Sequence, residues 1–154
     1  MSSIIPEKIK IHYVKVFKSN HNVTDQYLDN PVNPASFKVG YSQDTSVGMD
    51  DKRLRVRLNI DLKGIDETEN EVGIFAEYGI EFQVEVENLE EFFEVIDNEP
   101  KFSSILGGTI MGILYSTARG IIIERTQSTF FRGVILPVIN PSLLIEGISK
   151  NSNL

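Results

Sequence analysis

Acidic side chains are the most concentrated chemical groups in this chain. Nine of them lie between Glu77 and Glu99, and no Lys or Arg interrupts the run. Carboxylates at this density can form a solvated surface, an acidic patch that steers a basic partner, or the paired acid and base of an enzyme. Nothing in the spacing marks one carboxylate as buried against another, so the pattern gives no support to an enzymatic pair.

The other residues with chemical potential are two histidines and a glycine-rich stretch. His12 and His21 lie in an expected strand and an expected loop, with no carboxylate or hydroxyl at a suggestive spacing. The glycines of LGGTIMG do not follow a strand, and no Gly-Lys-Ser/Thr triplet follows them, which argues against a phosphate-binding loop. The absence of cysteine excludes disulfides, thiolate metal sites and thiol nucleophiles. We therefore expect no catalytic residue, no metal and no cofactor.

The bulk composition narrows the class of protein. The 154 residues fit a single domain, residues 1–154, and the formal charge of −7 disfavours nucleic acid and anionic membrane surfaces as partners. The amino-terminal segment alternates charge and apolarity and lacks the continuous apolar core of a signal peptide. The cytoplasm is therefore the expected compartment.

Four segments alternate between apolar and polar residues, as strands do. The clearest strand runs from Leu54 to Leu62, and the fourth begins near Val72 and is most regular from Ile80 to Val86. Residues 8–17 form a first strand whose alternation shifts in phase, which indicates a bulge. A second, short strand covers residues 37–41.

The polar segments between these strands predict loops at residues 18–36 and 43–52. The strands should pair as an antiparallel sheet with one apolar face and one polar face. On the polar face, Arg55 and Arg57 of the third strand would lie opposite a row of glutamates on the fourth.

The apolar period changes to about 3.6 residues after the fourth strand. Leu89, Phe92, Phe93 and Ile96 then predict a short helix with Asn88 as its N-cap, broken at residues 97–100. A long apolar helix should run over residues 102–127, followed by an extended segment, FFRGVILPVI. A last helix is expected after Asn140, with Pro141 at its first position. Strands followed by helices predict an α+β fold.

The long helix has two unusual features. Residues 105–123 are apolar enough to span a membrane, but Arg119 would then lie in hydrocarbon, so we expect no span. Small residues also recur every four positions and form a stripe along one face. Such a stripe predicts close approach by another element, either the last helix of the same chain or the same helix of a second copy. We expect the second copy, which makes the stripe an oligomer interface: Ser104, Gly108, Gly112, Ser116 and Gly120.

The segment from Leu114 to Leu144, LYSTARGIIIERTQSTFFRGVILPVINPSLL, resembles the last third of SecB-family protein-export chaperones. Ala118 and Arg119 match the family's Ala-Arg pair, and Asn140 matches its helix-capping Asn. Ile122, Phe131 and Leu136 match the next core position, the aromatic residue and the connection. The chain departs from the family at Ser116 and Thr117, at Gly120, at Arg132 and at Pro137, so the resemblance is to a divergent member.

The resemblance implies a tetramer built as a dimer of dimers, which binds unfolded polypeptide in long apolar grooves. Exposed apolar and aromatic side chains would line such grooves. The residues expected to bind the client are Phe37, Tyr41, Phe75, Tyr78, Tyr115, Phe130, Phe131, Val134 and Ile135. The family also binds a SecA translocase motor through an acidic patch, whose equivalent here would be Glu81, Glu85 and Glu87.

Three functions follow as hypotheses. The leading one is an ATP-independent holdase chaperone, SecB-like, cytoplasmic and homo-oligomeric, without catalysis, that takes part in protein export. The second is a SecB-like chaperone dedicated to one client, such as an antitoxin. The third is an enzyme or small-ligand carrier, which would need an enclosed pocket with converging polar groups between sheet and helices.

Overall fold

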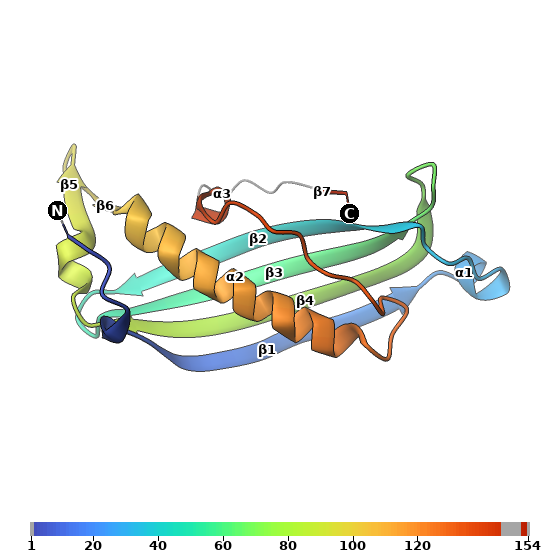
Figure 1. Cartoon of the computed structure of the whole chain (residues 1–154), viewed down its shortest axis with the longest axis horizontal. Coiled ribbons are helices and arrows are strands. Elements are labelled where there is room, and N and C mark those ends of the chain that lie inside the picture. Colours follow the sequence, from blue (N-terminus) through green and yellow to red (C-terminus); the bar gives the residue numbers. More distant parts are fainter. Residues whose placement is uncertain (1, 146–151, 154) are drawn as a thin grey trace.

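A computed structural model describes residues 2–145 and 152–153, and these form one layer of long strands with a helix across it. The strands are β1 (Ile9–Val23), β2 (Ser36–Gly48), β3 (Arg53–Ile65), β4 (Glu71–Val86), β5 (Phe93–Ile96), β6 (Glu99–Phe102) and β7 (Ser152–Asn153). The helices are α1 (Asp25–Asp29), α2 (Ser104–Thr126) and α3 (Ser142–Ile145), with 3-10 turns η1 (Pro6–Lys8) and η2 (Leu89–Phe92). In Figure 1, α2 crosses one face of the sheet diagonally.

The main sheet has the order β1-β4-β3-β2-β7, and all its pairs are antiparallel. The α+β class, the four-stranded antiparallel sheet and the following long and short helices are therefore confirmed. The expected bulge in the first strand is also present, because the pairing of β1 with β4 shifts between Ile11 and Tyr13 and again between Val16 and Lys18.

Two predicted loops are correct only in part: residues 30–35 and 49–52 lie between elements, but most of the rest of each segment forms strand or helix. Residues 18–23 continue β1, and residues 25–29 form α1, whose first turn is capped by Thr24 Oγ1 accepting from the amide of Tyr27 at 3.2 Å. Residues 43–48 continue β2 along β3. Both extensions carry mostly polar side chains at sheet edges, where main-chain hydrogen bonds maintain a strand without an apolar pattern.

The predicted helix after the fourth strand is correct only in its first turn, which follows Asn88 as a 3-10 helix, and its continuation through Ile96 is wrong. Leu89 and Phe92 are buried in the short turn η2, while Phe93 begins a hairpin in which β5 pairs with β6. Asp97 and Asn98 both have positive φ, as a two-residue hairpin turn requires. Strands of four residues are too short for their alternation to be distinguished from a helical period.

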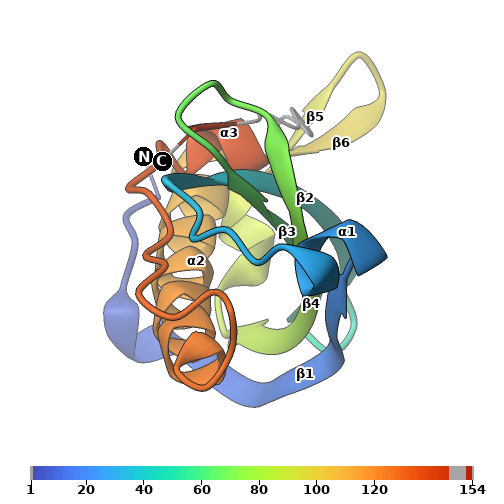
Figure 2. The same ribbon diagram turned by 90° about the vertical axis from the view of Figure 1, so that its right-hand side faces the viewer.

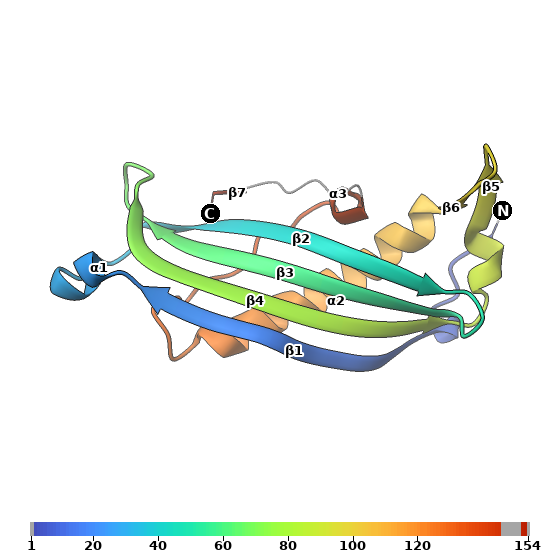
Figure 3. The same ribbon diagram turned by 180° about the vertical axis from the view of Figure 1, so that it is seen from behind.

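The core lies between the sheet and α2. Leu106, Ile110, Leu114, Ala118 and Ile122 face the sheet at intervals of four residues and are fully or almost fully buried. Figure 2 shows α2 against the inner surface of the curved sheet, with the chain that follows it running alongside. Figure 3 shows the opposite face, which no helix of the described residues covers. Among these residues, α2 is the one helix long and apolar enough to cross a membrane, a property that core helices of soluble proteins share.

Candidate apolar binding surface

The segment between α2 and α3 lies as an extended chain beside the helix (Figures 1 and 2). We refer to residues 130–139 as the connection. Its side chains alternate: Val134 and Leu136 are buried, whereas Ile135 and Val138 are 58% and 84% exposed. The connection therefore contributes one row of side chains to the core and presents a second, apolar row to solvent.

Two side chains of α2 hold the connection in place. The hydroxyl of Tyr115 donates to the carbonyl of Pro137 at 2.7 Å, and Nε of Arg119 donates to the carbonyl of Leu136 at 3.0 Å. Burial raises the pKa of the Tyr115 phenol, so this group remains a neutral donor. Arg119, the matched arginine of the sequence resemblance, thus bonds the main chain of the connection.

Aromatic rings anchor the beginning of the connection. The ring of Phe131 lies 5.5 Å from that of Phe37 and 6.3 Å from that of His21, measured between centroids. Phe130 meets Tyr27 edge-on at 5.4 Å but remains 52% exposed. The two adjacent rings therefore have different roles, since Phe131 fills the core and Phe130 stays on the surface.

An apolar cleft of about 250 Å³ opens where the amino-terminal half of α2 passes the edge strand β2. We call it the β2–α2 cleft. Apart from the polar side chains of Gln43, Thr45 and Ser103, its lining is apolar. The residues that line it are Gln43, Thr45, Val47, Leu54, Phe102, Ser103, Leu106, Gly107, Ile110, Met111 and Ile145. Thr45 Oγ1 donates to Gln43 Oε1 at 2.5 Å, so these two polar groups satisfy one another. The cleft is large enough for one or two apolar side chains of a ligand.

The nine residues expected to bind a client are divided by the structure. Tyr41, Tyr78, Tyr115, Phe131 and Val134 are buried, so the expectation that they are exposed is wrong. They pack between sheet, α2 and connection because each lies on an inward-facing position.

The remaining four are accessible to different degrees. Phe130 and Ile135 are exposed, and Phe37 is half-buried on the helix side of the sheet. Phe75 is half-buried on the opposite face, where Lys63 Nζ lies 5.8 Å from its ring centroid. Phe75 is therefore not part of the surface formed by the other three.

Most of the β2–α2 cleft was missed from the sequence. Its β2 side comes from residues 43–47, which were predicted as loop, and its far side comes from Ile145. The alternation of Gln43, Thr45 and Val47 is the one signal that could have indicated a strand there. The contact of Ile145 with this strand depends on the path of the connection and has no local signature.

The small-residue stripe of α2 has two different environments. A Cβ on Gly108 would lie 3.7 Å from Ser142 Oγ, and one on Gly112 would lie 3.5 Å from Cγ of Pro141. These are ordinary contacts with the same chain. A Cβ on Gly120 would meet no atom within 4 Å, and Ser104 and Ser116 are exposed.

The acidic residues expected to form a docking patch are paired within the sheet. Glu81 accepts from Arg55 Nη2 at 2.9 Å and from Arg57 Nε at 2.7 Å, which confirms that opposite charges face each other on this surface. These bonds hold the pKa of Glu81 below its ordinary value. Glu85 lies 2.5 Å from Nε2 of His12.

Glu87, the third carboxylate of the expected patch, is also paired within the sheet. It lies 2.5 Å from Lys10 Nζ, and this bond lowers the pKa of Glu87. A basic partner would have to replace ion pairs that the sheet already makes.

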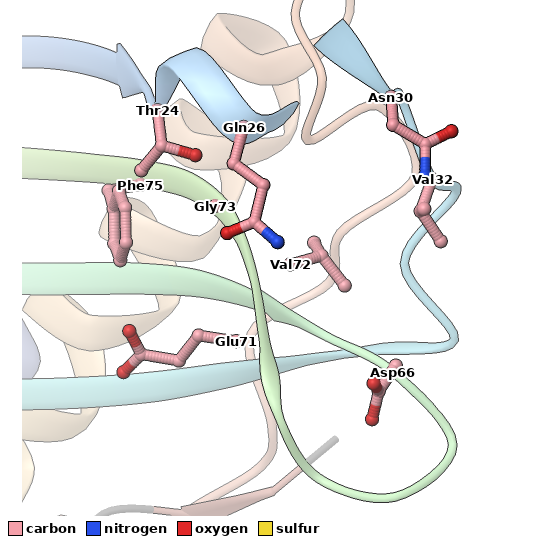
Figure 4. Close-up of a pocket in the computed structure, with 9 residues that line it drawn as sticks. All are labelled: Thr24, Gln26, Asn30, Val32, Asp66, Glu71, Val72, Gly73 and Phe75. Atoms are coloured by element: carbon pink, nitrogen blue, oxygen red, sulfur yellow. The ribbon is translucent and has the colours of Figure 1, made fainter. Parts of the chain in front are cut away.

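A more polar pocket lies at the opposite end of the sheet, between α1 and the β3–β4 turn (Figure 4). It measures about 300 Å³, and Gln26 and Asp66 lie on its two sides. Asp66 already accepts from the amides of Thr68 and Asn70, and Glu71 pairs with Lys63. No group of three or more His, Asp or Glu side chains among the described residues could hold a metal ion.

His21 of β1 and Tyr78 of β4 form a polar contact close to Phe131. His21 Nε2 bonds the Tyr78 hydroxyl, and burial lowers the pKa of His21 and raises that of Tyr78. Burial therefore favours the neutral form of both groups, and the pair fixes the packing of β1 against β4.

Comparisons with known proteins find likeness in the fold. No protein-family model and no curated protein sequence matches the chain. Mycobacterium tuberculosis Rv1957, a SecB-like chaperone solved in complex with a ChAD peptide from the Rv1956 HigA1 antitoxin, is similar with a TM-score of 0.53 and 11% identity over 86% of this chain and 91% of that one. A protein of unknown function from Streptococcus agalactiae is similar with a TM-score of 0.44 and 13% identity over 84% and 97%.

Proposed function

We propose that this chain, which has the fold of the SecB-like chaperones, is an ATP-independent holdase that binds unfolded polypeptide. The observation that carries the proposal is the apolar β2–α2 cleft together with the exposed apolar row of the connection. Exposed apolar surface costs solubility, and a protein that retains it commonly uses it for binding.

The binding surface would use its parts differently. The β2–α2 cleft would take one or two apolar side chains of the client, and the exposed Phe130, Ile135 and Val138 would contact further residues. Met111 in the cleft wall suits clients of varied sequence, because its side chain adapts to differently shaped partners. No step of this binding needs a nucleotide or a metal.

Self-association would cover apolar side chains that a single chain leaves exposed. The outer face of α2 exposes Ile105, Ile113 and Ile123, and the edge strand β1 exposes Val14 and Phe17. An unpaired edge strand with apolar side chains is a surface that proteins usually cover. The proposal therefore includes a cytoplasmic homo-oligomer, with a dimer of dimers as the arrangement that the resemblance implies.

A second candidate function is a chaperone dedicated to one client. Rv1957 has a similar fold and was solved with a peptide from an antitoxin, which favours this alternative over an enzyme or small-ligand carrier. A role in export through a SecA-like motor stays a prediction, because the three carboxylates of the expected docking patch are paired with bases of their own sheet.

The test combines a mass measurement with client binding. Static light scattering should give the mass of an oligomer, and the protein should suppress aggregation of a denatured client at near-stoichiometric amounts. Val47→Lys would place a charge at the rim of the β2–α2 cleft and should weaken binding of reduced, carboxymethylated α-lactalbumin at least severalfold. Ser46→Lys, one residue away on the other face of β2, is the matched control and should bind normally.

Two results would contradict the proposal. One is a stable monomer that leaves aggregation unchanged. The other is equal loss of binding in both lysine variants, because that would show a general effect of charge rather than a contact in the cleft. Co-purification of one defined protein would instead favour the dedicated-client alternative over a general holdase.

A further inference from the structure

The end of the chain returns to the sheet beside the proposed binding surface. β7 pairs antiparallel with β2, with Asn153 opposite Lys38 and Ser152 opposite Val39. The other edge of β2 pairs with β3 along its whole length, from Ser36 to Gly48. Among the described residues, β7 is the one strand on the outer edge of β2, and it covers two positions at one end.

The last residue of α3 lies in the β2–α2 cleft. Ile145, the last residue of α3, lines the cleft with Gln43, Thr45 and Val47 of β2. Its side chain packs so close to α2 that a Cβ on Gly107 would lie 2.8 Å from its Cδ1 atom. Ile145 thus lies against one end of β2, and β7, which begins seven residues later in the sequence, pairs with the other end.

We propose that the carboxyl-terminal strand β7 is an intramolecular competitor of the client, occupying part of the β2 edge until unfolded polypeptide displaces it. This inference rests on the proposed function and adds its regulation. An extended client offers the same main-chain donors and acceptors as β7, so both can add to the edge of β2 as a strand. Only one segment at a time can pair with the outer edge of β2 at Lys38 and Val39.

The strength of this competition depends on how few residues of β7 pair with β2 and on how close β7 lies to Ile145 in the sequence. Two paired residues contribute few hydrogen bonds, so β7 alone would bind the edge weakly. Because β7 begins only seven residues after Ile145, its local concentration at the edge of β2 is high, so even a weak contact is populated. A segment that occupies the edge for half to nine-tenths of the time would lower the apparent client affinity by about two- to tenfold.

The test compares three proteins with one unfolded probe, reduced and carboxymethylated α-lactalbumin. The first is the full chain, and the second lacks residues 146–154. The third, Ser152→Pro with Asn153→Pro, keeps the length and charge of the segment but removes the two main-chain donors of β7. Both altered chains should bind the probe about two- to tenfold more tightly than the full chain.

Two further measurements make the test specific. The free peptide EGISKNSNL, residues 146–154, should weaken probe binding by the shortened chain, whereas a scrambled peptide should not. Amide signals of Lys38 and Val39 should shift in the nuclear magnetic resonance spectrum of either altered chain.

The outcomes are distinct. Probe binding of equal strength by all three proteins, or unchanged amide signals at Lys38 and Val39, would overturn the competition while leaving the holdase function standing. Failure of all three proteins to bind the probe or to suppress aggregation would overturn the proposed function, and the competition with it.

Discussion

Replacing Arg119 by methionine should release the connection from α2. The guanidinium group donates to the carbonyl of Leu136, a residue with no exposed surface. Methionine keeps much of the aliphatic length of arginine and a good helix propensity, so the change removes chiefly the donor. The carbonyl of Leu136 would then lack this partner in a buried position.

The expected loss follows from that carbonyl. A buried acceptor that loses its donor costs about 1–3 kcal/mol, and the charged donor places this bond in the upper half of the range. We therefore expect Arg119→Met to lower the free energy of unfolding by about 2 kcal/mol. Tyr115→Phe removes a neutral donor to the adjacent carbonyl of Pro137 and should cost about 1 kcal/mol. Because the two carbonyls are consecutive, the double variant should show coupling rather than simple addition.

Urea unfolding followed by far-ultraviolet circular dichroism measures these losses, at one fixed protein concentration because oligomerisation contributes to stability. Arg125→Met is the matched control, since Arg125 is exposed and its closest carboxylate, Glu124, lies 3.8 Å away. That change should stay within about 0.5 kcal/mol of the unaltered protein. An Arg119→Met variant as stable as the control would show that the bond to Leu136 does not hold the connection, and the reasoning would be wrong.

Three further predictions follow from the surface and the core. Phe131→Ala should lower the free energy of unfolding by about 3–5 kcal/mol, whereas Phe130→Ala should cost far less and instead weaken client binding, as measured by urea unfolding and probe affinity. The free energy of unfolding should fall as the pH drops from about 6 to about 3, because the pKa of Glu81 is lower in the folded protein than its ordinary value of 4.5. Ionised Glu81 therefore contributes stability above pH 4.5, and this contribution is lost as the pH falls through the lowered folded pKa. Glu81→Gln should make the urea midpoint depend less steeply on pH. Gly120→Leu should leave the fold intact and reduce the mass seen by light scattering, and an unchanged mass would remove Gly120 from the oligomer interface.

The sheet could be predicted from the sequence where burial is one-sided. From Leu54 to Leu62 in β3 and from Ile80 to Val86 in β4, each apolar residue alternates with a charged or polar one. A single register therefore satisfies both faces, and the pairing of Arg57 with Glu81 follows from it. The hairpin of β5 and β6 could not be predicted, because Phe93 and Ile96 fit a helical spacing equally well. The hairpin is instead stabilised by the contact of Phe93 with Phe102, whose ring centroids are 4.4 Å apart.

The binding surface was less predictable for a different reason. An aromatic residue is apolar whether it fills a core or contacts a client, so Phe130 and Phe131 cannot be distinguished by type. Their separate roles depend on how the connection leaves α2. The β2–α2 cleft likewise combines Val47 and Ile145, which lie far apart in the sequence and meet only after the connection has crossed the sheet.

The glycine stripe of α2 now divides into two parts with different explanations. Gly108 and Gly112 lie against the start of α3, at Ser142 and Pro141, so the chain itself accounts for their small size. A larger residue at Gly112 would therefore disturb α3 as well as any partner, and its effect on an oligomer could not be assigned. A Cβ on Gly120 would meet no atom within 4 Å beyond its own helix turn, yet glycine lowers the helix propensity by about 1 kcal/mol relative to alanine. No contact within the described chain accounts for a glycine at this position. Substitution of Gly120, rather than of Gly112, therefore tests whether a second copy of α2 packs against this helix.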